Sequence, residues 1–242
     1  MTADAKLEGR CSLDSGGDPE EVRDPSTLEP WEEAYRRFET PKQEERKFVR
    51  RLKQIGALRW PRDARIVELF CGRCNGLNAL SALGFCKLEG VDMSPRLLAL
   101  YRGPARTYVG DCRSLPFERE SRDILIVQGG LHHLQTLPSD LEKCLSEVHR
   151  VLRADGLFVA IEPWQTFFLG MVHRICRIRF ARRCSRKIDS LAKMIELEQG
   201  TYDRWLLSGP EVVRIFSKYF VERRVRVGWG KRVFVGVPRQ SA

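Results

Sequence analysis

Two acidic residues and a glycine turn lie close together in the first half of the chain. A short apolar stretch includes Glu68, a turn with Gly72 and Gly76 follows, and a second apolar stretch ends at Asp92. This order predicts a strand, a turn, a helix and a second strand, which bring both acids to one edge of a sheet. There Asp92 could accept hydrogen bonds from both hydroxyl groups of a ribose. The glycines would let the backbone approach such a ligand closely.

The turn differs from the pattern that binds a pyrophosphate. A dinucleotide-binding turn has the pattern G-x-G-x-x-G, whereas the small residues here are Gly72, Cys74 and Gly76. The carboxylate of Glu68 would repel a pyrophosphate, but it suits an ammonium group or a ribose hydroxyl. An NAD-binding oxidoreductase is therefore a weak interpretation of this segment.

The acids and glycines of this segment belong to a longer ordered series. The series consists of Glu68, Gly72, Gly76, Asp92, Asp111 and the segment Asp123–Gln128. It resembles the class I S-adenosylmethionine (SAM) dependent methyltransferases, in particular the small-molecule, type-11-like group with a paired histidine after the fourth strand. The resemblance covers roughly residues 65–163, with a weaker match near the C-terminus.

The resemblance implies SAM as the cofactor and a Rossmann-like α/β fold, in which helices flank a doubly wound, mostly parallel, seven-stranded sheet. In that family the glycine turn lies under the methionine part of SAM, the second-strand acid holds the ribose, and an acid after the third strand meets the adenine amine. Glu68, Asp92 and Asp111 match the family's acidic positions. The cofactor-binding residues that the resemblance implies are Glu68, Gly72, Cys74, Gly76, Asp92, Met93, Asp111, Cys112 and Gln128.

Cys74 departs from the family pattern, which usually has glycine at this position. A side chain costs about 1 kcal/mol or more if the backbone there needs a positive φ. This departure leaves open a non-catalytic SAM-binding domain as an alternative function.

Two histidines follow the fourth predicted strand in the segment Gln128–Leu134. An imidazole that titrates near neutrality suits a general base. His133 matches the paired-histidine position of the family, and His132 lies beside it, so both are catalytic candidates. The alternative is that they only shape the loop around SAM.

Three residues after the fifth predicted strand are candidates for acceptor contacts. Glu162 could bind an amine, Trp164 could form part of an aromatic cage, and His173 follows in the same segment. Packing is an equally good interpretation of Trp164.

The pair Cys71-x-x-Cys74 has the spacing of zinc and thioredoxin-like redox sites. Zinc needs a second ligand pair, and the chain has no second C-x-x-C. A redox dithiol at a helix start is compatible with the pattern. We interpret both cysteines as small residues of the turn, and we expect no metal site.

Length and composition predict one α/β domain with appendages. The chain has 242 residues, 43% of them apolar, and a net charge of +10. The charged first residues do not fit a secretory signal, and no apolar run is long enough to cross a membrane. We therefore expect a cytoplasmic protein with reduced cysteines.

Five segments are predicted along the chain. They are a disordered stretch (1–28), N-terminal helices (29–62), the SAM-binding α/β core (63–163), a helical cap insertion (164–208), and a C-terminal helix with a closing β-hairpin (209–242). Resembling proteins use N-terminal helices to close over the cofactor, so Trp31 and Tyr35 are either lid residues or core residues. Asp155 and Gly156 are expected to turn the chain before the fifth strand.

The predicted cap is amphipathic and basic. Its apolar residues recur every three or four positions, which predicts two helical pieces that end near Gly200; they are Met171, Ile175, Ile178, Ala181, Cys184, Ile188, Leu191 and Ile195. Seven positive residues and no acid lie between Arg174 and Lys187. They could bind RNA, a protein, an anionic small substrate or a membrane surface, or only face solvent. Because Phe180 is the one aromatic residue among them, we favour a small-molecule acceptor, with an RNA or protein methyltransferase as the alternative.

Overall fold

Seven strands form one sheet in the order β3-β2-β1-β4-β5-β7-β6. The computed structural model describes residues 25–240. The strands are β1 (Arg65–Leu69), β2 (Lys87–Asp92), β3 (Arg106–Val109), β4 (Arg122–Gln128), β5 (Leu152–Pro163), β6 (Phe220–Gly228) and β7 (Lys231–Pro238). Strands β1 to β5 pair in parallel, whereas β7 is antiparallel to both β5 and β6. The predicted doubly wound, mostly parallel, seven-stranded sheet and its closing hairpin are confirmed.

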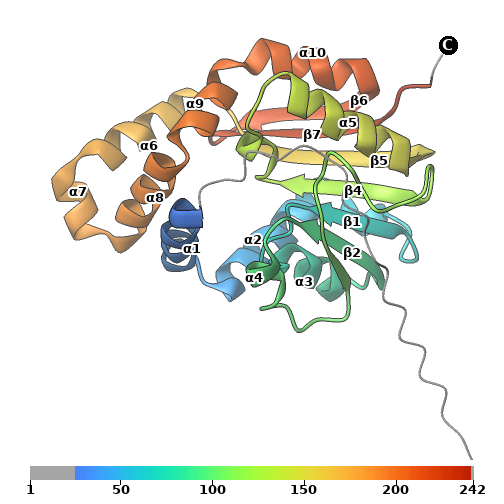
Figure 1. The fold of residues 1–242 in the computed structure, drawn as a ribbon, viewed down its shortest axis with the longest axis horizontal. Helices are drawn as coiled ribbons and strands as arrows, with labels where there is room; N and C mark the ends of the chain where they lie inside the picture. The colour runs from blue at the N-terminus through green and yellow to red at the C-terminus, as the bar shows by residue number, and fades with distance from the viewer. Residues whose placement is uncertain (1–24, 241–242) are drawn as a thin grey trace, which may run out of the picture.

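Helices lie on both faces of the sheet (Figure 1). They are α1 (Pro25–Phe38), α2 (Pro41–Gln54), η1 (Ala57–Arg59), α3 (Asn75–Ala82), α4 (Pro95–Leu98), η2 (Leu131–His133), α5 (Ser139–Val151), α6 (Phe167–Arg177), α7 (Arg179–Cys184), α8 (Arg186–Leu197), α9 (Gln199–Leu207) and α10 (Gly209–Tyr219). In Figure 1, α2, α3 and α4 lie on one face and α5 and α10 on the other, while α6, α7 and α8 project beyond the sheet. None of the helices described is long and apolar enough to cross a bilayer.

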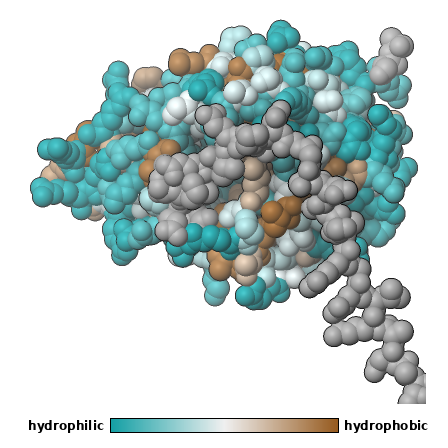
Figure 2. Space-filling model, viewed as in Figure 1, coloured by the Kyte–Doolittle hydropathy of each residue, from teal (hydrophilic) through white to brown (hydrophobic). Residues whose placement is uncertain are grey.

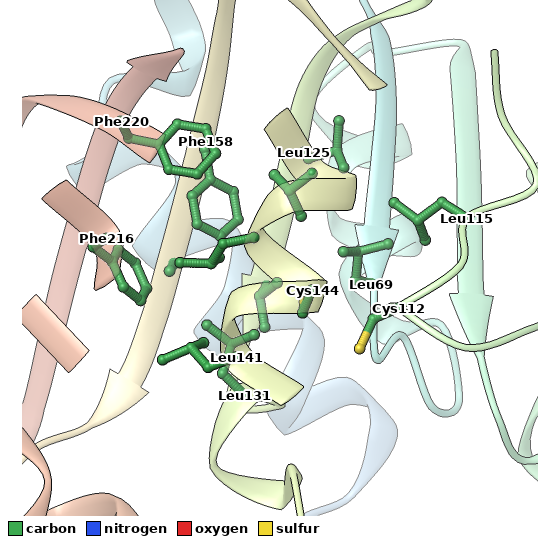
Figure 3. Packing of buried hydrophobic residues seen from close by; sticks show 14 of the residues in the cluster. Leu69, Cys112, Leu115, Leu125, Leu131, Leu141, Cys144, Phe158, Phe216 and Phe220 are labelled. Atoms are coloured by element: carbon green, nitrogen blue, oxygen red, sulfur yellow. The ribbon is translucent and has the colours of Figure 1, made fainter. Parts of the chain in front are cut away.

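Each face of the sheet carries its own hydrophobic core. On the face of α5 and α10, the ring of Phe158 lies 4.9 Å from that of Phe220 and 5.8 Å from that of Phe216. Leu141 of α5 is fully buried in the same cluster (Figure 3). The central strands are buried on both faces because they alternate side chains between the two clusters, and β4 shows this with Ile126 on one side and Leu125 on the other.

The strand order reverses between β1 and β4, since β2 and β3 follow β1 on one side and β5 follows β4 on the other. The pair Leu69 and Val127 marks the end of the β1–β4 register. In open α/β sheets, ligands bind beyond the carboxyl ends of the strands at such a reversal. Glu68 and Gln128 lie at this point.

The helix starts follow from local sequence. Ser94 caps α4, because its Oγ accepts a hydrogen bond from the amide of Leu97 at 3.2 Å, and Pro95 follows as the first helical residue. Helix α1 begins at Pro25, inside the segment predicted to be disordered. The earlier part of that predicted segment lies outside the described residues.

The cap differs from its prediction. It contains four helices instead of two, because extended backbone at Ile178 and Ser185 ends α6 and α7, and non-helical backbone at Glu198 separates α8 from α9. Gly200 lies inside α9 and does not end the helical segment. The expected turn at Asp155 and Gly156 lies within β5, where the pairing with β4 shifts register.

Candidate active site

Glu68 is buried directly against the glycine turn. A Cβ atom on Gly76 would lie 1.9 Å from Glu68 Oε1, so glycine at position 76 is what makes room for this carboxyl. Only 3% of Glu68 is exposed, and this burial raises its pKa from 4.5 to about 8. Burial makes the ionised form of this carboxyl costly, so a positively charged partner would stabilise it more than it would stabilise an exposed carboxyl.

Glu68 and Gln128 together offer two unsatisfied acceptors. Gln128 Nε2 donates to Glu68 Oε1 at 3.2 Å. Glu68 Oε2 and Gln128 Oε1 are buried and have no hydrogen bond of regular geometry among the described residues, and the amide of Leu77 is the backbone donor that lies near the Glu68 carboxyl. Because buried polar atoms are nearly always paired, these two oxygens indicate a missing donor group such as an ammonium.

Asp92 accepts hydrogen bonds from the turn that follows β1 and from the turn that follows β2. The amide of Gly72 donates to its Oδ2 at 2.7 Å, and the amide of Ser94 donates to its Oδ1 at 2.8 Å. These two amides fix the carboxylate of Asp92 at the carboxyl edge of the sheet, where its oxygens are the acceptor type that a ribose hydroxyl needs. Met93 follows on the same edge with 64% of its side chain exposed, where it can flank a ligand.

Asp111 is held by an arginine that sequence reasoning missed. Arg113 donates to Asp111 Oδ2 from Nε at 2.9 Å, and it also reaches Asp140 at 2.9 Å. Burial alone would raise the pKa of Asp111, but the hydrogen bonds from Arg113 hold it below its ordinary value. The thiol of Cys112 lies in the core with Cys144 (Figure 3), so a ligand contact at position 112 is left to the backbone.

Glu44 ties the N-terminal helices to the glycine turn. It lies on α2 and is buried, and its Oε2 accepts hydrogen bonds from Arg73 at 3.0 Å and Asn75 at 2.7 Å. Tyr35 of α1 donates to the other oxygen. Nothing in the local sequence marked this residue, because its partners lie about thirty positions further along the chain.

Cys74 adopts the left-handed conformation with φ +61°, directly before α3. The side chain is fully buried, 3.7 Å from the sulfur of Cys71. The hydrogen bond between the two thiols and the burial of Cys71 both raise the pKa of the Cys71 thiol. A redox-active cysteine needs a lowered thiol pKa, so these sulfurs do not have the environment of a redox dithiol.

We expect the substitution Cys74→Gly to leave cofactor affinity unchanged or to increase it. Glycine removes the cost of a positive φ, about 1–2 kcal/mol, while the lost burial and the greater chain entropy offset much of this gain. Thermal unfolding and SAM affinity measure the two effects. Loss of activity in both Cys74→Gly and Cys71→Ser, with the fold intact, would instead assign a function to the thiol pair.

Glu162 organises the loop that carries the two histidines. Its Oε1 accepts hydrogen bonds from the amides of Gly130 at 2.9 Å and Leu131 at 3.0 Å, and its Oε2 lies 2.8 Å from Nδ1 of His132. Burial would raise the pKa of Glu162, but His132 and the two amides hold it below its ordinary value. An ionised carboxylate can only accept, so Nδ1 of His132 donates. These contacts make Glu162 the anchor of the histidine loop, and its expected role as an acceptor contact stays a prediction.

His133 faces a carboxylate from the cap. Nδ1 of His133 lies 3.0 Å from Oε1 of Glu198, at the junction of α8 and α9. The ring of Trp31 meets His133 edge-on at 5.7 Å and stacks on Tyr35 at 5.1 Å. The structure thus brings His133 into contact with α1 and with the junction of α8 and α9. His132 is buried beside it, and burial lowers its pKa.

His132, His133 and Glu198 also have the side-chain types of a metal site, with their ligand atoms within 4.8 Å of one another. Two ligands of one zinc ion, each about 2.1 Å from it, lie about 3.4 Å apart in tetrahedral geometry. The 3.0 Å contact between His133 Nδ1 and Glu198 Oε1 is shorter than this spacing, and it is a direct ion-pair contact without the geometry of a hydrogen bond. We therefore treat His133 and Glu198 as an acid–base pair.

Trp164 and His173 have separate surroundings. The amide of Trp164 donates to Gly230 at 2.9 Å, and Arg232 lies 5.2 Å from the centre of its ring. These contacts give Trp164 a packing role, which was the alternative interpretation from the sequence. His173 Nε2 lies 3.3 Å from the hydroxyl of Tyr202, whose ring is 5.7 Å from that of His132. His173 thus lies one side chain away from the paired histidines.

Residues around this site match a known protein domain. The family described as "Methyltransferase domain" matches residues 67–160. An uncharacterized methyltransferase of Synechocystis is 32% identical over 101 residues, which cover 40% of this chain and 46% of that protein. The phthiotriol/phenolphthiotriol dimycocerosates methyltransferase of Mycobacterium leprae is 35% identical over 98 residues, which cover 38% of this chain and 35% of that protein. The matches thus span less than half the length of these relatives.

Solved structures share the whole fold at low sequence identity. A protein of Pyrococcus horikoshii superposes with a TM-score of 0.66 at 19% identity, covering 86% of this chain and 98% of that one. A putative SAM-dependent methyltransferase of Methanococcus maripaludis gives a TM-score of 0.59 at 11% identity, covering 95% and 99% of the two chains. A TehB-like SAM-dependent methyltransferase of Corynebacterium glutamicum gives 0.55 at 16% identity, covering 89% and 100%.

Proposed function

We propose that this chain, which carries a class I SAM-dependent methyltransferase domain, transfers the methyl group of SAM to a small-molecule acceptor. SAM is the cofactor of that domain. The observation that carries the proposal is the pair of buried, unsatisfied oxygens of Glu68 and Gln128 beside the glycine turn. They fit the ammonium of the methionine part of SAM.

Three acids divide the recognition of the cofactor. Glu68 holds the ammonium, Asp92 accepts from the ribose hydroxyls, and Asp111 faces the adenine amine. Contacts within the protein hold two of these acids, since Asp92 accepts from the amides of Gly72 and Ser94 and Asp111 accepts from Arg113. SAM supplies an activated methyl group on a positively charged sulfur, so the protein mainly has to align the acceptor and remove its proton.

His133 is the proposed general base. It follows β4 at the carboxyl edge of the sheet, and Glu198 lies close enough to fix the orientation of its ring and to stabilise the imidazolium that proton transfer creates. His132, held by Glu162, positions this loop. Trp31 of α1 and Glu198 of the cap both lie against His133, and this cover over the proposed base supports a small acceptor rather than a macromolecule. The relative from Mycobacterium leprae is named for methylating phthiotriol and phenolphthiotriol dimycocerosates, and a small-molecule acceptor agrees with that name.

The test is transfer of a labelled methyl group into cell extract that is then separated into small molecules, protein and RNA. We expect the label in the small-molecule fraction. His133→Ala and Glu198→Gln should lower the transfer rate about 10²–10⁴-fold and about tenfold or more, respectively, while SAM binding persists.

His149→Ala is the matched control, because His149 is a half-buried histidine whose contacts are to Arg239, Tyr219 and Phe220 and not to the proposed site. It should transfer at the wild-type rate. Label in the RNA or protein fraction would contradict the small-molecule acceptor. Full activity of His133→Ala would contradict the assigned base and leave the acceptor class standing.

A further inference from the structure

The outer face of α6 and α7 exposes apolar side chains. The exposed fractions are 92% for Phe167, 53% for Ile178 and 75% for Phe180, and Met171 and Ile175 are exposed between them. Phe167, Met171, Ile175 and Ile178 recur every three or four residues, so they share one side of the helix. Met171, Ile175 and Ile178 belong to the apolar repeat that the sequence predicts would pack on the domain. In the structure this part of the repeat faces outward.

Helices α6 and α7 and the first turn of α8 carry most of the excess positive charge of the chain. Seven positive residues lie between Arg174 and Lys187, of a net charge of +10. Arg182 is neutralised by Asp189 at 3.0 Å and by Glu196. The other six have no ion pair with any described acid; they are Arg174, Arg177, Arg179, Arg183, Arg186 and Lys187. Hydrophilic and hydrophobic residues alternate over the projecting helices in Figure 2.

An exposed tryptophan extends this surface to the β6–β7 turn. Trp229 is 77% exposed, and its ring lies 5.1 Å from that of Phe168 at the start of α6. Tryptophan at the edge of an apolar patch is typical of proteins that meet a lipid–water interface.

We propose that α6, α7 and the β6–β7 turn form a lipid-binding face, which attaches the protein to an anionic phospholipid bilayer. An in-plane helix of this kind combines exposed apolar residues that enter the headgroup region with arginines that contact lipid phosphates. A second copy of the chain fits poorly, because two faces that each carry four arginines without an ion pair on α6 and α7 would repel each other. RNA fits the charge but not the aliphatic residues, since Met171, Ile175 and Ile178 offer no ring on which a base could stack.

The position of the lipid-binding face ties it to the active site. Helix α6 starts at Phe167, a few residues after β5 ends at Pro163 on the ligand-binding edge of the sheet. Its His173 contacts Tyr202, which in turn lies against His132. The bilayer would therefore bind next to the edge at which the acceptor enters.

The experiment is sedimentation of the full chain with vesicles of phosphatidylcholine containing phosphatidylglycerol, compared with vesicles of phosphatidylcholine alone. We expect binding to the anionic vesicles that weakens as salt is raised. A basic variant, Arg177→Gln, Arg179→Gln and Arg183→Gln, should bind about 100-fold more weakly, since each arginine near an anionic surface contributes about fivefold. An apolar variant, Phe167→Ser, Ile178→Ser and Phe180→Ser, should also bind at least tenfold more weakly.

A control variant removes the same charge elsewhere. It carries Arg119→Gln, Arg223→Gln and Arg226→Gln, three exposed positions outside the cap, and it should bind like the wild type. Equal loss in the basic variant and this control would reduce the effect to net charge and overturn the proposal. So would wild-type binding by the apolar variant, or retention on RNA that the basic variant loses and the apolar variant keeps. Vesicle binding needs neither SAM nor an acceptor, so it is independent of methyl transfer.

Discussion

Replacing Glu68 by glutamine is expected to stabilise the cofactor-free protein and to abolish its binding of SAM. The carboxyl is buried against Gly76, so its ionisation costs free energy until a cation arrives. Glutamine has nearly the same shape and can still accept the hydrogen bond from Gln128. It carries no negative charge for the ammonium of SAM.

The direction of the pH dependence follows from the raised pKa of Glu68. The unfolded chain ionises this group near 4.5, whereas the folded protein ionises it at about 8. Between these values the unfolded state holds fewer protons, so the contribution of Glu68 to stability falls as pH rises, by up to about 1.4 kcal/mol per pH unit. At pH 7 the substitution Glu68→Gln should therefore recover up to about 3 kcal/mol of unfolding free energy.

Urea unfolding without SAM, between pH 5 and about pH 8, measures this effect. The stability gain of Glu68→Gln over the wild type should widen as pH rises. The exposed substitution Glu118→Gln serves as control and should show no such trend. A variant Glu68→Gln that binds SAM with wild-type affinity would remove Glu68 from the site.

Replacing Glu162 by alanine is expected to lower the unfolding free energy by about 3–5 kcal/mol and to abolish methyl transfer. The substitution leaves the amides of Gly130 and Leu131 and the Nδ1 proton of His132 buried without an acceptor. The loop that positions His133 then loses its anchor. Glu162→Gln should be milder, because it keeps one oxygen for the two amides.

Acid should lower the unfolding free energy of the wild type through Glu162 and His132. The pKa of Glu162 is lowered by His132 and the amides against the effect of burial, and the pKa of His132 is lowered by burial. Both groups bind protons more readily in the unfolded chain, so their contribution to stability is lost as pH falls below about 6.5 for the histidine and about 4.5 for the acid. Glu68 has the opposite pH dependence, because its contribution to stability falls as pH rises.

Below about pH 4.5 the unfolding free energy should therefore fall more steeply for the wild type than for Glu162→Gln, which has no carboxylate at this position to take up a proton on unfolding. Glu222→Ala, on the exposed edge strand β6, is the control for Glu162→Ala and should change stability little. Equal stability of Glu162→Ala and the control would show that the histidine loop does not depend on this carboxylate.

The core of the fold and the cofactor edge could be predicted from sequence because their signals are local. Each strand is a short apolar run, and Gly72, Gly76 and Asp92 lie within one βα unit. Even the positive φ of Cys74 was foreseeable, because the family has glycine at that position. Glu198 could not be found in this way. It reaches His133 only because α8 and α9 fold back over the sheet edge, which no pattern near either residue encodes.

The surroundings of the cap helices also could not be predicted from local sequence. Apolar residues every three or four positions predict helices, but they do not say whether the apolar side meets the protein or the surroundings. The breaks at Ile178 and Ser185 turn α8 back to pack against α1, and the face of α6 is left exposed. The role of Glu162 was hidden for a related reason, since its partners are backbone amides.

Calorimetric titration with SAM and with NAD tests the central claim that this edge of the sheet binds SAM. We expect the wild type to bind SAM and not NAD, with SAM at 100 times its Kd raising the unfolding free energy by about 2.7 kcal/mol. Asp92→Ala should lose SAM binding, whereas Asp155→Ala, at an exposed aspartate near the start of β5, should retain it. Wild-type SAM affinity in Asp92→Ala, or equal affinity of the wild type for NAD and SAM, would contradict the account.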